Sequence, residues 1–162
     1  MSIINAKNSL VKQVETQIEQ RLKAGVREPF EKIVIAGMKY ALKGAGGNLM
    51  DQLDDSKDPL TDIVKGAIGI VGALRRAAKG AMPVDALVPA AMVLVLHGLD
   101  YAERAGLLKV DKATIDQATQ LFIETITPLL GLPPEKLTQL VGQAHATMAD
   151  QDKMAKLQMG AK

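Results

Sequence analysis

The residues of this sequence best suited to chemistry are grouped at His97, which directly follows the most apolar run of the chain. Asp100 and Arg104 follow at steps of three and four residues, and such steps place side chains on one face of a helix. An imidazole beside a carboxylate could bind a metal ion or relay a proton. A metal site needs three or four converging ligands, however, and this face offers two at most. We therefore interpret His97, Asp100 and Arg104 as a buried polar network in which Asp100 pairs with Arg104.

Other patterns that would support catalysis or cofactor binding are missing from the sequence. The chain has no cysteine, two histidines and no Gly-x-Ser-x-Gly segment that would present a nucleophilic serine. The glycine-rich run at 44–47 is not a phosphate loop, because no Gly-Lys-Ser or Gly-Lys-Thr follows it. We favour a solvated loop over a cation site for the acidic stretch at 51–58, and a packing or surface role for His145. We predict a protein that is not an enzyme and binds no metal and no cofactor.

The composition indicates helices that pack closely on one another. Hydrophobic residues make up 48% of the chain, yet it has two Phe, two Tyr and no Trp, with eight Met and fourteen Gly. Strands prefer aromatic and β-branched side chains, whereas small residues let helix axes approach and Met fills irregular gaps. We therefore predict a single all-α domain of five to six helices over residues 1–150. Residues 151–162 are expected to form a tail that frays or binds a partner.

Helical spacing of apolar residues, together with Gly, Pro and capping Asp residues, predicts where these helices lie. In the first helix we expect Val11, Val14 and Ile18 to face the core, and Glu15 and Glu19 to lie on the polar face. Two other boundaries depend on proline. A short turn is expected before a main helix that begins at Pro89, and the fifth helix ends at 126, or at 130 if Pro128 only distorts its end. The predicted helices are 8–24, 29–43, 58–79, 89–105, 111–126 and one from 134.

The central prediction is an apolar, Gly- and Ala-rich helical hairpin within residues 60–106. A glycine inside a helix costs about 1 kcal/mol relative to alanine, so several of them indicate close approach of another helix, either in the same chain or in a second subunit. The uncharged run 86–99 is shorter than the roughly 20 residues that span a bilayer. In the free monomer we favour a hairpin covered by the other helices. The candidate helix-packing or oligomer contacts are Gly66, Gly69, Gly72, Ala90, Ala91 and Gly98.

Charge gives little indication of a nucleic-acid partner. The formal net charge is only +2, with acids and bases interspersed. Arg75, Arg76 and Lys79 could contact phosphate, but single-strand binders usually add aromatic stacking platforms and the neighbours here are Ala and Gly. We favour a simpler role, in which these cations complement the helix dipole at a helix end.

Two apolar segments, residues 30–39 and residues 88–100 with the upstream Met82-Pro83, resemble small helical virion proteins of tailed bacteriophages. The resemblance covers about residues 26–134 and rests on apolar texture and helix boundaries. Such proteins include the structural and ejection components of short-tailed phages, and ejection proteins assemble a conduit for DNA through the host envelope. The resemblance carries no catalytic residues.

The resemblance implies a homo-oligomeric, non-enzymatic ejection component. Its expected partners are copies of itself, other virion proteins and a membrane, with nucleic acid contacted at most in a lumen or transiently. Its expected location is the virion and, after ejection, the host envelope. The alternative is a soluble helical adaptor or capsid-associated module that binds proteins without membrane contact. That alternative is supported by the lack of an uncharged run long enough to span a bilayer.

Overall fold

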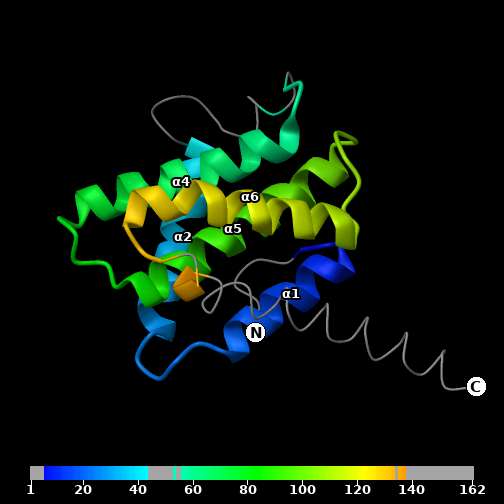
Figure 1. Cartoon of the computed structure of the whole chain (residues 1–162). Coiled ribbons are helices and arrows are strands. Elements are labelled where there is room, and N and C mark those ends of the chain that lie inside the picture. The colour runs from blue at the N-terminus through cyan, green and yellow to red at the C-terminus, as the bar shows by residue number, and fades with distance from the viewer. Residues whose placement is uncertain (1–5, 44–52, 54–55, 134, 138–162) are drawn as a thin grey trace, which may run out of the picture.

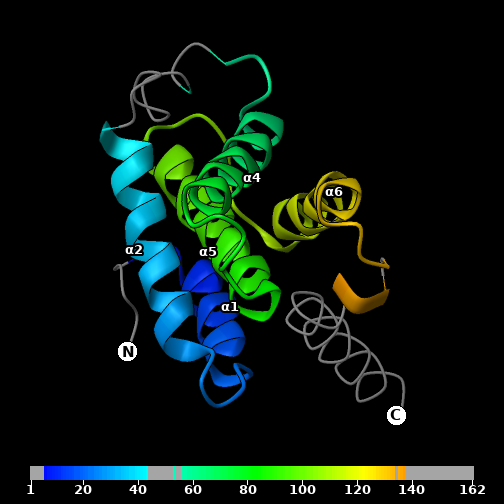
Figure 2. The same cartoon turned by 90° about the vertical axis from the view of Figure 1, so that its left-hand side faces the viewer.

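One buried helix, α5 (Val84–Arg104), organises the fold. It contacts all four of the other long helices, which are α1 (Ser9–Gln20), α2 (Arg27–Lys43), α4 (Pro59–Ala77) and α6 (Lys112–Leu130). This computed structural model describes residues 6–43, 53, 56–133 and 135–137, and within those ranges every regular element is helical. The predicted all-α class is therefore confirmed. Figure 1 shows α4 and α6 side by side, and Figure 2 shows α2 and α6 on opposite sides of α4 and α5.

The core forms around α5 because this helix has no polar face over most of its length. Every residue from Ala86 to Asp100 is buried, including the predicted contact residues Ala90 and Ala91. The surrounding helices each turn one apolar stripe inward, as Val11 and Ile18 do from α1 and Phe122 does from α6. Burying one large apolar side chain contributes about 1.5–3 kcal/mol, so the contacts of α5 with four helices dominate the stability of the fold.

Two glycines allow neighbouring helices to approach α5 closely. A Cβ added at Gly98 would lie 2.7 Å from Ile63 Cγ2 of α4, and one added at Gly37 of α2 would lie 2.6 Å from Leu94 Cδ1. Real Cβ atoms essentially never approach a heavy atom so closely. Gly98 was one of the predicted packing positions, whereas the sequence analysis did not single out Gly37.

Proline marks helix boundaries less strictly than the sequence analysis predicted. Instead of a short turn followed by a helix from Pro89, α5 runs unbroken from Val84 with Pro89 inside it. Proline removes one backbone donor and normally destabilises a helix interior. Here Pro89 is fully buried among apolar neighbours, whose packing offsets that loss. Likewise α6 continues past Pro128 to Leu130 and ends at Gly131, whose φ of +65° is left-handed.

The helix α5 also corrects the expectation that no segment is long enough to span a bilayer. By length and composition alone, Val84–Arg104 is a candidate span, because the helix includes the charged residues that bound the uncharged run. In its most apolar window, however, 83% of the residues are buried inside the fold. A core helix of a water-soluble protein passes the same test, so this finding is weak evidence for a membrane.

Several predictions fall wholly or largely outside the described residues. These are the acidic stretch at 51–58, of which 53 and 56–58 are described, His145, and the tail at 151–162. Of the helix predicted from residue 134, only 135–137 are described; they are helical, and Leu137 is buried.

Candidate interaction groove and buried polar network

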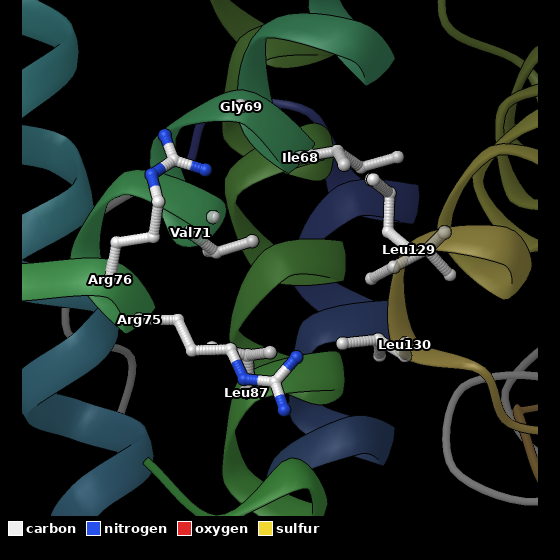
Figure 3. A pocket seen from close by; sticks show the side chains of 10 residues that line it. Ile68, Gly69, Val71, Arg75, Arg76, Leu87, Leu129 and Leu130 are labelled. Atoms are coloured by element: carbon white, nitrogen blue, oxygen red, sulfur yellow. The ribbon is translucent and has the colours of Figure 1, made fainter. Parts of the chain in front are cut away.

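A groove with a volume of about 280 Å³ lies between α4 and α6, over the first turns of α5. We call it the α4–α6 groove. Its floor is apolar, because Leu87 and Ile126 are both fully buried, and its rim includes Leu129, which is 62% exposed. Figure 3 shows Leu129 near Ile68 across the groove, and Leu130 at the level of Leu87 and the end of Arg75. The lining residues are Ile68, Gly69, Val71, Gly72, Arg75, Arg76, Leu87, Ile126, Leu129 and Leu130.

Gly69 and Gly72 of α4 line this groove, on the outer side of the helix and not against α5. Gly69 is exposed, and Gly66 and Gly72 are half-buried. A Cβ at Gly69 would meet no atom within 4 Å, and one at Gly72 would meet only Arg76 Nη1, at 3.6 Å. Within the described residues, therefore, no other helix closely approaches Gly69 or Gly72. The inner face of α4 is instead formed by larger residues such as Ile63. That these glycines form contacts between subunits stays a prediction.

Two arginines give the α4–α6 groove a cationic edge. Arg75 and Arg76 lie in the last turn of α4, and neither forms an ion pair within the described residues. Figure 3 shows Arg75 extending across the groove toward Leu87, while Arg76 lies along α4 toward Gly69. None of the described residues that line the groove is acidic. Its chemistry therefore suits an apolar helix that carries a carboxylate, because the helix would bury the floor and pair with an arginine.

A second feature, buried between α1 and α5, is an imidazole–carboxylate pair. His97 Nε2 lies 3.1 Å from Glu15 Oε2, and the two residues are 4% and 1% exposed. Glu15 was predicted to lie on the polar face of the first helix, and that prediction is wrong. A signal was present, however: Glu15 lies four residues after Val11 and three before Ile18, which places it inside the apolar stripe of α1. The partner on α5 could not be identified without the tertiary structure.

Asp100 does pair with Arg104, and it also holds the start of α1. Its Oδ2 lies 3.2 Å from Arg104 Nε. Its Oδ1 accepts hydrogen bonds from the backbone N–H groups of Lys7 and Asn8, at 3.0 and 2.8 Å. Hydrogen bonds to a charged carboxylate contribute more than neutral ones. Asp100 therefore links α5 to the residues immediately before α1, a connection that the sequence did not indicate. His97 and Asp100, which were predicted to act together, have separate partners: His97 contacts Glu15 within α1, whereas Asp100 binds the residues immediately before it.

Asn8 completes this connection. Its side-chain oxygen accepts the N–H groups of Leu10 and Val11 and so caps α1. Its side-chain amide donates to Glu103 Oε1 at 2.8 Å. We call Asn8, Asp100 and Glu103 together the α1 anchor.

Glu19 is a buried carboxylate without adequate compensation. It is 6% exposed, contrary to the prediction that it lies on the polar face, and its Oε1 has no hydrogen-bond partner among the described residues. Burial raises the pKa of Glu19, and the nearby carboxylate of Glu15 raises it further, while Arg27 opposes both effects. Because burial keeps a substrate away from Glu19, we interpret it as a structural carboxylate.

The polar groups between α1 and α5 suit a structural role. In the described part of the chain, no three His, Asp or Glu side chains converge in a way that could hold a metal ion. His97 is enclosed between two helices, so it holds α1 against α5 and presents no nitrogen to a ligand. Among the described residues, the α4–α6 groove is an open surface that could bind an apolar partner. Comparisons with known protein families, curated proteins and solved structures found no match to this chain.

Proposed function

We propose that this protein is a non-enzymatic structural component of a phage virion, which assembles with copies of itself and takes part in delivering DNA through the host envelope. The virion setting is suggested by the resemblance of residues 26–134. The observation that carries the proposal of self-assembly is the α4–α6 groove. It combines an apolar floor, an exposed helical glycine and two arginines that form no ion pair with another described residue.

The free-energy cost of the glycines in α4 supports the proposal that a second helix packs on the outer face of α4. Each of Gly66, Gly69 and Gly72 costs about 1 kcal/mol relative to alanine inside a helix. No contact within the described chain offsets that cost at Gly69. A second helix that packs against glycine would do so, because its backbone can approach closely where no Cβ intervenes. The exposed Leu129 on the opposite rim would be buried by the same event.

An ejection conduit must contact the membrane. Such contact would require a change in this fold. The candidate span α5 is enclosed, so it can meet lipid only after a covering helix has moved away. The burial of α5 therefore favours the second candidate function, a helical adaptor that binds proteins and never contacts lipid. Both candidate functions involve assembly through helices. They differ in whether α5 stays buried or becomes exposed to lipid.

The mass of the native particle tests the proposal. The purified protein would be examined in buffer and in detergent by native mass spectrometry, alongside flotation with vesicles of phosphatidylethanolamine and phosphatidylglycerol. We expect a particle that is a multiple of 17.3 kDa in buffer. Flotation together with vesicle leakage supports the conduit, whereas an oligomer that does neither supports the adaptor. A monomer at every concentration in both solvents overturns self-assembly.

A further inference from the structure

The outer face of α4 has a charge pattern that is complementary to itself. Asp62, Gly69 and Arg76 are each one heptad apart, so helical geometry keeps them on one narrow stripe. All three are exposed. Gly69 is at the centre, and the acid and the base lie seven residues to either side, about 10 Å along the axis at 1.5 Å per residue. The stripe is therefore acidic at one end, basic at the other and without a side chain in the middle.

We propose that two copies of this chain pair through antiparallel α4 helices that cross at Gly69. A two-fold axis at Gly69 places Asp62 of each copy opposite the partner's Arg76, so the arrangement forms two equivalent ion pairs. This inference rests on the proposed self-assembly and specifies its first contact. The occupant of this face is therefore a second copy, because the same stripe supplies both halves of the interface.

The side chains near the crossing fit this arrangement. A Cβ at Gly69 would meet nothing within 4 Å, so space is open for the partner's backbone. The same symmetry places Gly66 opposite the partner's Gly72, and Lys65 opposite the partner's Ala73. A parallel pair would instead place Asp62 against Asp62 and Arg76 against Arg76, and directly opposed like charges are destabilising. The charge pattern therefore selects the antiparallel arrangement.

Both charged groups are available for such pairing. Arg76 forms no ion pair within the described residues, and its Nη1 lies near Gly72 on the outer face. Ser56 Oγ donates a hydrogen bond to Asp62 Oδ2, while Oδ1 accepts none within the described residues. The partner's helix would also lie beside the α4–α6 groove, which Gly69 and Arg76 line.

Cysteine cross-linking tests the geometry, because the chain has no cysteine of its own. Gly69→Cys is expected to form a disulfide-linked dimer on mild oxidation. With a short bismaleimide, the Asp62→Cys protein and the Arg76→Cys protein should each give little dimer alone, whereas a mixture of the two should give much, because the mixed dimer brings the two cysteines together and keeps the other ion pair. Self-cross-linking of Asp62→Cys alone, at the level of the mixture, would indicate a parallel pair and overturn the proposal.

Charge reversal tests the ion pairs independently. Asp62→Lys and Arg76→Glu should each weaken self-association about tenfold or more, which corresponds to about 1.4 kcal/mol. The double variant Asp62→Lys/Arg76→Glu restores the opposite charges and should recover most of that loss in sedimentation velocity. Glu124→Lys makes the same change on the side of α6 away from the groove and should have no effect. Melting curves from circular dichroism confirm that each variant folds.

The outcomes separate this inference from the proposed function. If the wild-type protein associates but Gly69→Cys does not cross-link and charge reversal changes nothing, the α4 pairing is wrong while self-assembly stands. If the wild-type protein is monomeric at every concentration, both proposals fail together. If the α4 pairing is right, Gly69→Gln should convert the associated protein to monomers, because its long side chain fills the crossing and, unlike cysteine, cannot bond to its symmetry mate. Ala113→Gln, on an exposed position of α6, should leave association unchanged.

Discussion

Replacing glycine by alanine is expected to lower stability at Gly98 and to raise it at Gly69. Gly98→Ala should lower the free energy of unfolding by about 1–3 kcal/mol, because overpacking a filled core costs that much. The atom in the way is Ile63 Cγ2, 2.7 Å from the added Cβ, and a methyl group on Cβ moves only when χ1 or the backbone moves. Gly69→Ala is the control, since nothing lies within 4 Å there. In the dilute monomer it should raise stability by up to about 1 kcal/mol. Urea denaturation measures both, and equal effects would contradict the close contact.

The pair between Glu15 and His97 gives a second prediction. Glu15→Ala leaves a buried imidazole without its partner and creates a cavity, so the free energy of unfolding should fall by about 1–3 kcal/mol. Glu15→Gln keeps a hydrogen-bonding oxygen near His97 and should lose less. Gln13→Ala, on the exposed side of the same helix, is the matched control. A Glu15→Ala variant as stable as this control would show that the pair does not stabilise α1 on α5.

The raised pKa of Glu19 predicts that its effect on the stability of the fold depends on pH. Its pKa is raised by burial and by Glu15, so the folded state favours its protonated form. The stability that protonated Glu19 provides is complete below the ordinary glutamate pKa of 4.5 and is lost as the pH rises through the raised value. At neutral pH, Glu19→Gln should therefore be more stable than the wild type, by up to about 1 kcal/mol. The difference should shrink near pH 4.5, and a variant less stable at neutral pH would show that the carboxylate is well compensated.

Among the helices, α1 is the one attached most strongly through polar contacts. Asp100→Ala removes the acceptor of two backbone N–H groups and should cost about 2 kcal/mol of stability. Hydrogen exchange at Val11 and Val14 should become faster than exchange within α5, because α1 opens before the rest of the fold. Asp85→Ala, which breaks only a long contact of 3.9 Å with Lys23, is the control on the same helix. Unchanged exchange in α1 would mean that the α1 anchor does not hold it.

The helices themselves were largely predictable from local sequence signals. Asp58 caps α4 and Asp111 caps α6, each through a bond to a backbone N–H three residues on. Gly106 has a φ of +77° just after α5, where a helix stop was expected. Pro89 was misread because local propensity marks it as a boundary, and only burial by several helices overrides that preference.

The candidate site was less predictable, because it depends on contacts between distant segments. Gly98 was identified as a packing position, but nothing in the sequence around Gly37 distinguishes it from any other helical glycine. Glu15 was predicted to lie on the surface, because its partner His97 is distant in the sequence and lies on another helix. The α4–α6 groove exists only because α6 lies beside α4, and no motif in either helix specifies that arrangement.

At the scale of the whole molecule, the shared contacts of α5 predict a single unfolding transition for α2, α4 and α6. The helices α2 and α4 pack most extensively against α5, and α6 packs mainly against α4 and less against α5, so losing one of these helices exposes apolar surface that the others cover. Thermal melts followed by circular dichroism and by hydrogen exchange in α5 should give coincident midpoints. Two separated transitions that involve α4 or α6 would contradict this cooperativity.

The close contacts of α5 also restrict how this chain can change over generations. A larger residue at position 98 requires a smaller one at position 63, whereas the atom that meets a Cβ at position 37 is Leu94 Cδ1, at the end of a side chain that can shift. In any lineage that descends from this sequence, positions 98 and 63 should therefore diverge as a compensated pair and not singly. At Gly69, on the outer face of α4, no described residue lies close enough to impose such a restraint, so we expect this position to be restrained by a second copy if the proposed pairing occurs.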